Sequence, residues 1–229
     1  MFKVGAGMAV EVLSFDLTGT LVTNEFVDYF WLELIPKLYS EKRGISLSEA
    51  KKIVFKSYDE VGDRDLRWYT PSFWLELFEL GVDARSAVKL VEDKVEVYPD
   101  VEEVLEELSE DYTIIASSNL SIEFIEVALS KLGRHLFKAA FSCVSHYNSI
   151  SKTPEFYAYV CSRLSVEPGS VLHVGDDPEK DCLNPVKAGL NAILLDRDFK
   201  VSRSRCNIIR SLRELKGHVD KLAKVLKPH

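Results

Sequence analysis

The chain has 229 residues, of which 46% are hydrophobic and 28% charged, and its formal net charge at pH 7 is −7. The length allows one large α/β domain or a core with a smaller inserted domain. Because attraction to phosphate groups needs clustered Lys and Arg, the acidic balance argues against nucleic acid and anionic membranes as partners. No apolar run reaches the roughly 18 residues of a spanning helix, and we expect a cytoplasmic protein.

The first predicted strand, Val10–Phe15, is a short apolar run that leads directly into a motif of small and polar residues. This motif reads Asp16-Leu17-Thr18-Gly19-Thr20-Leu21. Its glycine-containing turn offers free backbone N–H groups of the kind that bind phosphate oxygens. A carboxylate placed there can be the nucleophile of phosphoryl transfer and form an aspartyl-phosphate. The alternative is an ordinary turn in which Asp16 is only a helix cap.

Residues 22 to about 98 contain no convincing strand and predict an all-helical insertion. Helical patterns cover Phe26–Lys42, the stretch after a Ser46–Glu49 capping box, Pro71–Leu80 and Ala84–Glu96. We therefore expect a cap, residues 22–98, inserted into a core formed by residues 1–21 and 99–229. An insertion at the carboxyl end of a strand lies above the usual ligand crevice of an open parallel sheet.

The cap segment Arg64–Trp74 is rich in aromatic residues and arginines. It is able to hold an organic leaving group and a second anion. The alternative, which we favour from the sequence alone, is an aromatic cap core with solvated arginines.

Beyond the insertion, short apolar runs alternate with helical patterns, which predicts parallel βαβ units. The expected strands are Thr113–Ser117, Ala139–Val144, Ser170–Val174 and Ala192–Leu195. The helices between them have legible start signals. These signals are Asp100 three residues before Glu103, Ser121 ahead of an apolar face, and Thr153 and Asp177, each followed by proline.

Polar residues follow the second and third predicted strands of the chain. Ser118 and Asn119 come directly after the second strand, where a hydroxyl and an amide can hold a phosphate oxygen or merely cap a helix. Lys152 lies just ahead of a helix. Its ammonium group can neutralise both a nucleophilic carboxylate and a bound phosphate, although a solvated surface lysine is the local alternative.

Three carboxylates, those of Asp176, Asp177 and Asp181, lie within six positions at the end of the Ser170–Val174 run. Mg²⁺ prefers hard oxygen ligands and usually takes one or two carboxylates together with waters and phosphate oxygens. Helix capping explains Asp177 but does not explain the other two. The cluster therefore predicts a magnesium site.

The four cysteines, Cys143, Cys161, Cys182 and Cys206, form no C-x-x-C pair, so a zinc site or thioredoxin-like motif has no support. Buried free thiols are the simplest expectation. The chain also lacks glutamine and is rich in Glu and Lys, a composition common in hyperthermophiles, whose intracellular proteins do form disulfides. One bridge is therefore possible, and the sequence does not say which pair would form it.

The segments at Asp16, Ser118, Lys152 and Asp176, in this order and spacing, are similar to the four signature motifs of the haloacid-dehalogenase-like superfamily. The resemblance covers about residues 10–215. It implies an α/β fold, with a Rossmann-like core of five or more parallel strands flanked by helices and an inserted helical cap. It also implies an Mg²⁺-dependent hydrolase or phosphotransferase that acts on a small phosphorylated metabolite. We expect a monomer or a homodimer.

The resemblance assigns a role to each matching residue. Asp16 is the nucleophile and a metal ligand, the Thr18 carbonyl is a second ligand, and Asp176 with Asp177 completes the metal site. Phosphate binding falls to Thr20, Ser118, Asn119 and Lys152, and Lys152 also stabilises charge. Asp181 supports Lys152 or the waters of the metal.

Two departures from the family pattern matter. Family phosphatases usually carry a second Asp two residues after the nucleophile as general acid and base, and here that position is Thr18. Threonine there resembles the ion-pumping ATPases of the superfamily, which keep their aspartyl-phosphate. The third motif is also offset, because aligning Pro154 puts Ser151 in the lysine position; we favour Lys152, since the reach of lysine tolerates a shift of one residue.

Two other functions stay open. A 2-haloacid dehalogenase would form an ester on Asp16, but such enzymes need no metal and usually lack the acidic fourth motif. A phosphate- or metabolite-binding module with little turnover would explain Thr18. Neither the substrate nor the general base is evident from the sequence.

Overall fold

The computed structural model describes residues 9–225, and for residues 222–225 the backbone only. Its centre is a six-stranded parallel sheet in the order β3-β2-β1-β4-β5-β6. The strands are β1 (Val12–Phe15), β2 (Thr113–Ser118), β3 (Phe137–Ser142), β4 (Val171–Gly175), β5 (Asn191–Leu195) and β6 (Asn207–Ile209). The strand order reverses between β1 and β4. In open parallel sheets, ligands bind outside the carboxyl ends of the strands at such a point.

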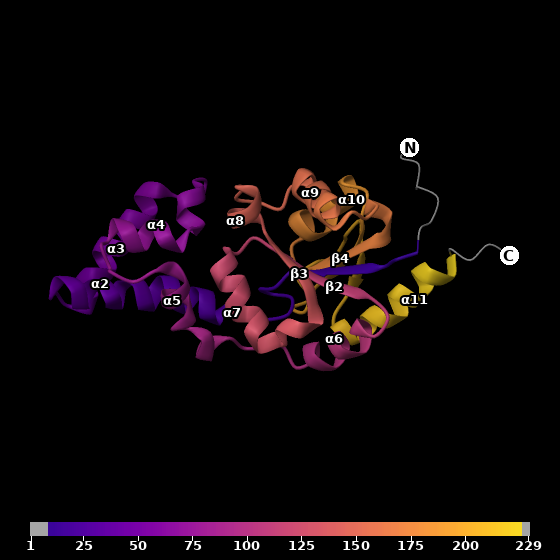
Figure 1. Ribbon diagram of the computed structural model, residues 1–229, viewed down its shortest axis with the longest axis horizontal. Coiled ribbons are helices and arrows are strands. Elements are labelled where there is room, and N and C mark those ends of the chain that lie inside the picture. Colours follow the sequence, from indigo (N-terminus) through magenta and orange to yellow (C-terminus); the bar gives the residue numbers. More distant parts are fainter. Residues whose placement is uncertain (1–8, 226–229) are drawn as a thin grey trace.

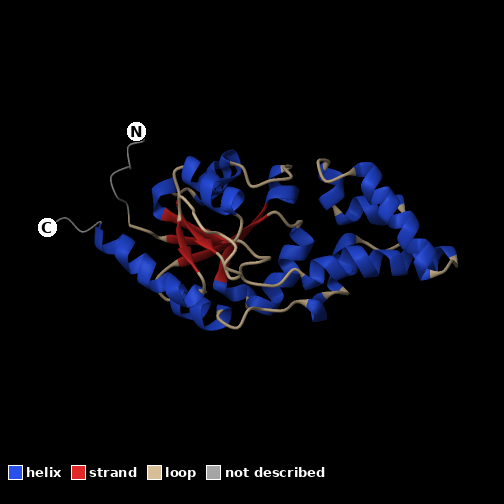
Figure 2. Ribbon diagram, turned by 180° about the vertical axis from the view of Figure 1, so that it is seen from behind, coloured by secondary structure: helices blue, strands red, loops and turns tan. Residues whose placement is uncertain are grey.

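Helices cover both faces of the sheet, as Figures 1 and 2 show. One face carries α6 (Val101–Ser109), α7 (Ile122–Leu132) and α11 (Leu215–Val225). The other carries α8 (Cys143–Tyr147), α9 (Pro154–Leu164) and α10 (Asn184–Lys187). Because both faces are covered, the strands are nearly continuous apolar runs, and β1 and β4 are buried at every position. The α/β, Rossmann-like core that the sequence predicted is confirmed.

Residues 22–98 form the helical insertion between β1 and β2, to the left of the sheet in Figure 1. Its elements are α1 (Glu25–Tyr29), a π-helical turn (Phe30–Leu34), α2 (Ile35–Arg43), α3 (Leu47–Val61), a 3₁₀ turn (Leu66–Tyr69), α4 (Pro71–Leu77), α5 (Ala84–Lys89) and a 3₁₀ turn (Glu92–Lys94). Ser46 accepts a hydrogen bond from the Glu49 N–H and caps α3 as expected. The domain boundary itself stays a prediction.

The two connections between cap and core run side by side. The Thr23 N–H donates to the Glu96 carbonyl over 2.9 Å, and the Tyr98 N–H donates to the Leu21 carbonyl over 3.1 Å. Arg197 of the core ties both connections together, because its guanidinium donates to the Thr20 carbonyl over 2.8 Å and stacks over the Tyr98 ring. The two connections between cap and core are thus held together by backbone hydrogen bonds and by Arg197.

Some local details differ from the sequence-based expectations. The third strand begins and ends two residues earlier than predicted, because Ser142 accepts from the Ser145 N–H and starts α8. The short strand β6 was not among the predicted runs, although a sheet larger than five strands was allowed. Thr153 caps α9 and Asp177 caps the π-helical turn Pro178–Leu183, both as predicted.

Two predicted caps were wrong. Asp100 makes no capping bond to α6; its carboxylate pairs with Arg197 and accepts from the Leu212 N–H over 2.8 Å. The Ser121 hydroxyl makes no capping bond to α7, where the Ile122 N–H donates to the Ser145 hydroxyl instead. In both cases a partner distant in sequence replaces the local one.

One disulfide, Cys182–Cys206, joins the π-helical turn after β4 to the segment before β6. Cys143 and Cys161 are buried free thiols. The bridge that the sequence left open is therefore present, and the other two thiols follow the simpler expectation. Within residues 9–225, every helix is too short or too polar to cross a membrane.

Candidate functional site

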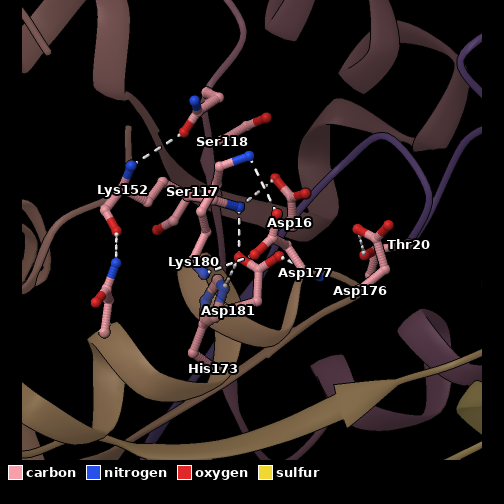
Figure 3. Close-up of polar contacts among 12 residues, drawn as sticks. Asp16, Thr20, Ser117, Ser118, Lys152, His173, Asp176, Asp177, Lys180 and Asp181 are labelled. Atoms are coloured by element: carbon pink, nitrogen blue, oxygen red, sulfur yellow. Dashed lines mark hydrogen bonds and ion pairs between the residues drawn. The ribbon is translucent and has the colours of Figure 1, made fainter. Parts of the chain in front are cut away.

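The candidate site lies at the carboxyl edge of the sheet, where β1, β2 and β4 end (Figure 3). Asp16 follows β1, Ser118 ends β2 and Asp176 follows β4. Asp16 is buried, with 7% of its surface exposed. Three segments that are far apart in sequence therefore deliver their polar residues to one place, as the alternating pattern predicted.

Lys152 reaches this place from the start of α9 and is 1% exposed. Its Nζ lies 2.8 Å from Asp16 Oδ1 and 2.5 Å from Asp181 Oδ1. Burial alone would lower the pKa of Lys152, but the two carboxylates outweigh this and raise the pKa above its ordinary value. The lysine is therefore charged, and it balances one of the two carboxylates between which it lies.

The backbone of Lys152 is held on both sides. Its N–H donates to Asn119 Oδ1 over 3.1 Å, and its carbonyl accepts from Asn184 Nδ2 over 2.9 Å. Asn119 also donates to the Ile150 carbonyl over 2.6 Å. These bonds fix Lys152 rather than Ser151 at the site. They also use both ends of the Asn119 side chain, so its predicted phosphate contact would have to come from its backbone.

Asp181 is fully buried and saturated with partners. Its Oδ1 lies 2.9 Å from His173 Nε2 in addition to Lys152, and its Oδ2 accepts from the Asp177 N–H over 3.0 Å. Burial raises the pKa of Asp181, but Lys152 and His173 outweigh it and hold that pKa well below its usual range. Asp181 is thus an ionised anchor for Lys152, and it has little room for another ligand.

A buried chain of polar groups continues beneath the anchor. His173 Nδ1 lies 2.8 Å from the Ser14 hydroxyl, which lies 2.9 Å from the Ser117 hydroxyl. The Tyr157 hydroxyl donates to the Lys180 carbonyl over 2.7 Å and lies 3.0 Å from His173 Nε2. Burial lowers the pKa of His173 and favours its neutral form, and because the Asp181 carboxylate can only accept, Nε2 donates to Asp181 Oδ1.

Three carboxylates, those of Asp16, Asp176 and Asp181, each offer an oxygen, and these oxygens lie within 4.8 Å of one another. Since Asp181 is saturated, Asp16 and Asp176 are the two that face the open side. Partial burial of Asp176, with repulsion from Asp16 and Asp181, raises its pKa to about 7. A pair of hard oxygen ligands with excess negative charge fits Mg²⁺, which takes one or two carboxylates and completes its shell with water or phosphate.

Asp177 lies apart from this group. Its Oδ1 accepts from the N–H groups of Glu179 and Lys180, and its Oδ2 lies 3.1 Å from the Lys180 ammonium. These contacts favour a capping role, and a metal-binding role for Asp177 stays a prediction. The structure brings Asp181 into the acidic group in its place.

Thr18 and Thr20 occupy the turn that follows Asp16. Thr18 is half-buried, and the Thr20 hydroxyl lies 3.5 Å from Asp176 Oδ1. Ser118 is buried at the end of β2. These positions agree with contacts to a phosphoryl group or metal, and the individual roles stay predictions.

Two glycines make the close approach of these segments possible. A Cβ at Gly19, where φ is +78°, would lie 2.4 Å from Asp176 Oδ2. A Cβ at Gly175 would lie 2.4 Å from Asp181 Cγ. Any side chain at either position would displace a carboxylate of the site.

A cavity of about 510 Å³ opens between the cap and the core beside the site. Its lining comes from the cap, from the loop after β2, from the segment before Lys152 and from the turn after β4: Val27, Asp28, Trp31, Asp63, Arg64, Trp68, Tyr69, Asn119, Leu120, Ser121, Phe124, Ile150, Ser151 and Lys180. Residues of the helical insertion thus line a cavity beside the site.

Sequence reasoning missed the residues that support the site from below. His173 was given no role, although it stands in a buried strand two residues before Gly175, where a polar side chain needs a partner. Tyr157 and Ser14 gave no signal, because their partners come from other elements. Asp28, which lines the cavity, is one helical turn from Glu25, and burial with repulsion from Glu25 raises its pKa.

Comparison with solved structures places this fold among known enzymes. The protein is similar to a HAD phosphatase from Thermococcus onnurineus, with a TM-score of 0.75, 26% identity, and coverage of 92% of this chain and 98% of that one. It also shares its fold with a 2-haloacid dehalogenase from Pseudomonas syringae pv. Tomato DC3000, with a TM-score of 0.64, 18% identity, and coverage of 93% and 99%.

Comparison of the sequence gives two matches, a short one to a curated relative and a long one to a family model. The GMP/IMP nucleotidase YrfG of Escherichia coli (strain K12) is 33% identical over 60 residues, or 26% of this chain. The match spans 27%, about a quarter, of the length of that relative. A family model described as haloacid dehalogenase-like hydrolase matches residues 10–189, a stretch that includes Asp16, Lys152 and Asp181. The chain therefore belongs to the haloacid dehalogenase-like hydrolases.

Proposed function

We propose that this protein is an Mg²⁺-dependent phosphatase or phosphotransferase that acts on a small phosphomonoester through an aspartyl-phosphate on Asp16. The observation that carries the proposal is the ion pair between Lys152 and Asp16 beside the exposed carboxylate of Asp176. The site thus combines Asp16 as the nucleophile, Lys152 as a fixed cation, and the carboxylates of Asp16 and Asp176 as two ligands for a metal. A phosphoryl group needs these three, because little covalent chemistry beyond positioning and charge stabilisation is required.

The residues divide the work as follows. Asp16 attacks phosphorus, while Lys152 and the hydroxyl of Ser118 hold the phosphoryl oxygens. Mg²⁺, held by Asp16, Asp176 and the Thr18 carbonyl, would supply charge neutralisation at the phosphoryl group. The bond from phosphorus to the leaving oxygen breaks as the bond to Asp16 forms, and the leaving oxygen takes a proton from solvent. Water then hydrolyses the acyl phosphate to inorganic phosphate and frees Asp16.

Thr18 bears on the second half of this reaction. A threonine hydroxyl can orient water but cannot accept its proton near neutral pH, so we expect hydrolysis of the aspartyl-phosphate to be slow. The product of the first step is then long-lived, as phosphotransfer to another acceptor would require. If hydrolysis of the aspartyl-phosphate did not occur at all, the protein would be a binding module without turnover.

The acidic pair weighs against a 2-haloacid dehalogenase. That reaction brings a carboxylate substrate to Asp16, and an added carboxylate at Asp176 would repel it without a cation in between. The 26% identity to a HAD phosphatase and the short match to a nucleotidase also support phosphate chemistry. The fold likeness to a dehalogenase at 18% identity carries no such information.

Hydrolysis of 4-nitrophenyl phosphate tests the proposal. We expect activity that requires Mg²⁺, is lost in EDTA, and falls below detection in Asp16→Asn, because the amide neither attacks phosphorus nor carries the charge of a ligand. Asp111→Asn is the matched control, since Asp111 is an exposed carboxylate at the opposite edge of the sheet. Full activity in EDTA, or halide release from 2-chloropropionate, would contradict the proposal.

A further inference from the structure

We infer that the leaving group of the substrate carries a flat aromatic ring, which binds against Trp31 and Trp68 in the cavity under the cap. The inference rests on the proposed phosphatase function and adds to it the chemical class of the substrate. It depends on how the three tryptophans of the chain are placed.

The cavity lies next to the reaction site. Among its lining residues, Asn119 holds the Lys152 backbone and Lys180 pairs with Asp177. A substrate whose phosphoryl group lies at Asp16 would therefore extend its leaving group into this space. The volume of about 510 Å³ lies within the range of clefts that bury a drug-sized ligand, about 300–1,000 Å³. A two- or three-carbon alcohol would leave most of it empty.

The walls of the cavity are aromatic. Trp31, Trp68 and Tyr69 come from the cap and Phe124 comes from α7 of the core. Trp31 and Trp68 also line a second, smaller cavity of about 120 Å³. Each of these indole rings thus borders two hollows. Rings that complete a core do not leave such space, because protein interiors are close-packed.

Trp74 provides the contrast within the same chain. It is fully buried and lines neither cavity, and it packs against Tyr58 at 4.6 Å and Phe78 at 5.7 Å between ring centroids. The segment from Arg64 to Trp74 is therefore divided: its last residue builds the cap core, and Trp68 faces the cavity. The sequence had offered these two interpretations as alternatives: Trp74 follows the aromatic-core interpretation, and the leaving-group interpretation stays a prediction for Trp68.

The two cavity tryptophans are fixed before any ligand arrives. The Trp31 ring meets Phe30 edge to face at 4.7 Å and Tyr58 edge to face at 6.0 Å. The Trp68 ring meets that of Tyr69 with centroids 5.0 Å apart, and the Trp68 carbonyl accepts from Trp74 Nε1 over 3.3 Å. A rigid aromatic wall loses little conformational entropy on binding, so a stacked ring keeps most of its attraction.

The two arginines of the same segment differ in whether another residue of the protein already binds their guanidinium groups. Arg67 forms two hydrogen bonds with Asp65 and lies over the Phe73 ring, so it is engaged within the cap. Arg64 lines the cavity and makes no ion pair with the side chains that the structure describes, those of residues 9–221. A guanidinium beside aromatic walls is a further surface on which a flat ring can stack.

Binding of two non-hydrolysable phosphonates to the wild-type protein in Mg²⁺ tests the inference. (1-Naphthylmethyl)phosphonate carries a ring and ethylphosphonate does not, and both keep the phosphoryl-like head. Because stacking of a base on an aromatic side chain changes affinity by about 5- to 150-fold, we expect the naphthyl compound to bind at least tenfold more tightly by calorimetry. We also expect it, and not ethylphosphonate, to quench tryptophan fluorescence.

The variants then locate the ring. Trp31→Ala and Trp68→Ala should each lower the ratio of the two affinities at least fivefold, whereas Trp74→Phe should leave that ratio unchanged. Equal binding of the two phosphonates to the wild type, or a ratio that falls only in Trp74→Phe, would overturn the inference and leave the proposed function standing. Absence of binding by either phosphonate in Mg²⁺ would overturn the proposed function itself.

Discussion

At the scale of single residues, the site depends on one buried cation among carboxylates. Lys152 lies within 2.8 Å of Asp16 and 2.5 Å of Asp181, and only Asp181 has further buried partners. An unpaired charge in such surroundings is costly, so Lys152 and Asp181 stabilise each other. Asp16 shares the ammonium group of Lys152 with Asp181, and the ion pair of Asp16 with that group is the weaker of the two. That arrangement keeps its carboxylate available for reaction.

Magnesium affinity should depend on pH through Asp176. Its pKa in the metal-free protein is raised to about 7, so the folded state holds a proton that the unfolded state releases at lower pH. The stabilisation from this proton is lost as pH rises through about 7. Because Mg²⁺ displaces the proton, its apparent affinity should rise by up to about tenfold per pH unit below that pKa. Calorimetry at pH 6 and pH 8 measures this directly.

Variants separate the two neighbouring carboxylates. Asp176→Asn should weaken Mg²⁺ binding at both pH values and reduce the pH dependence, and what remains comes from Asp16, whose pKa is also raised by burial. Asp177→Asn, which disturbs only a helix cap and a surface ion pair, should keep most of the dependence. Equal affinity of the wild type at pH 6 and pH 8 would contradict the assignment of Asp176 as a ligand.

Thr18 should make breakdown of the aspartyl-phosphate the slow step of turnover. A positioned general base typically contributes about 10²–10⁴-fold, and Thr18 supplies none. We expect labelled phosphoenzyme to accumulate in the wild type on rapid quenching, and Thr18→Asp to speed its breakdown at least tenfold. Thr18→Val, which keeps the shape without the hydroxyl, should accumulate the intermediate like the wild type. The idea fails if no burst occurs and the Asp variant is no faster.

The residues at the site were predictable from the sequence where a strand end places them. Asp16, Ser118 and Asp176 follow buried strands, and the parallel sheet brings such ends together. His173 and Tyr157 were not predictable, because their roles depend on contacts with Ser14 and Asp181 from other elements. Long-range packing, not local pattern, assigns those partners.

At the scale of elements, the π-helical turn after β4 folds back onto the end of its own strand so closely that only glycine fits at position 175. Gly175→Ala would place a methyl group 2.4 Å from Asp181 Cγ and force Asp181 away from Lys152. We expect kcat to fall at least tenfold, since Asp181, which anchors Lys152, sits on that turn. Steady-state kinetics with 4-nitrophenyl phosphate measures the change.

The control for this prediction is another glycine of the same segment. Gly169, just before β4, has open space where a Cβ would lie, so Gly169→Ala should keep wild-type kinetics. If the two alanine variants behave alike, the close approach at Gly175 does not matter for the reaction. Circular dichroism of both proteins would show whether the fold is retained.

Element boundaries show where local signals stop being sufficient. The caps at Ser46, Thr153 and Asp177 were predictable, since each bonds to an N–H within its own first turn. The carboxylate of Asp100 has the same local pattern but pairs with Arg197, 97 positions away. An ion pair with a guanidinium outweighs a neutral N–H as a partner for a carboxylate, and the sequence does not reveal that pairing.

At the scale of the whole molecule, cap and core share one apolar cluster. Phe26 and Phe30 of the cap meet Phe124 of α7, with ring centroids 5.9 and 5.0 Å apart. All three are buried in a cluster that also contains Trp74 of the cap and Leu13 of β1. Domains that move independently usually meet through smaller and more polar surfaces. The core and cap predicted from the sequence are therefore tightly coupled across this seam.

This coupling predicts that cap and core unfold together. All three tryptophans, Trp31, Trp68 and Trp74, lie in the cap, so tryptophan fluorescence reports on the cap and on its seam with α7, where the Trp31 ring lies 5.9 Å from that of Phe124. Far-ultraviolet circular dichroism reports on both parts. If the shared cluster holds them together, the two signals should follow one transition with the same midpoint in guanidinium chloride.

Phe124→Ala removes the central ring and should lower the free energy of unfolding by about 3–5 kcal/mol. In that variant we expect the fluorescence midpoint to move below the dichroism midpoint, because the cap loses its support first. Leu105→Ala, a buried change in α6 away from the seam, is the matched control and should lower both midpoints equally. Separate midpoints in the wild type would mean that the cap folds on its own, and the seam would then be a contact rather than a shared core.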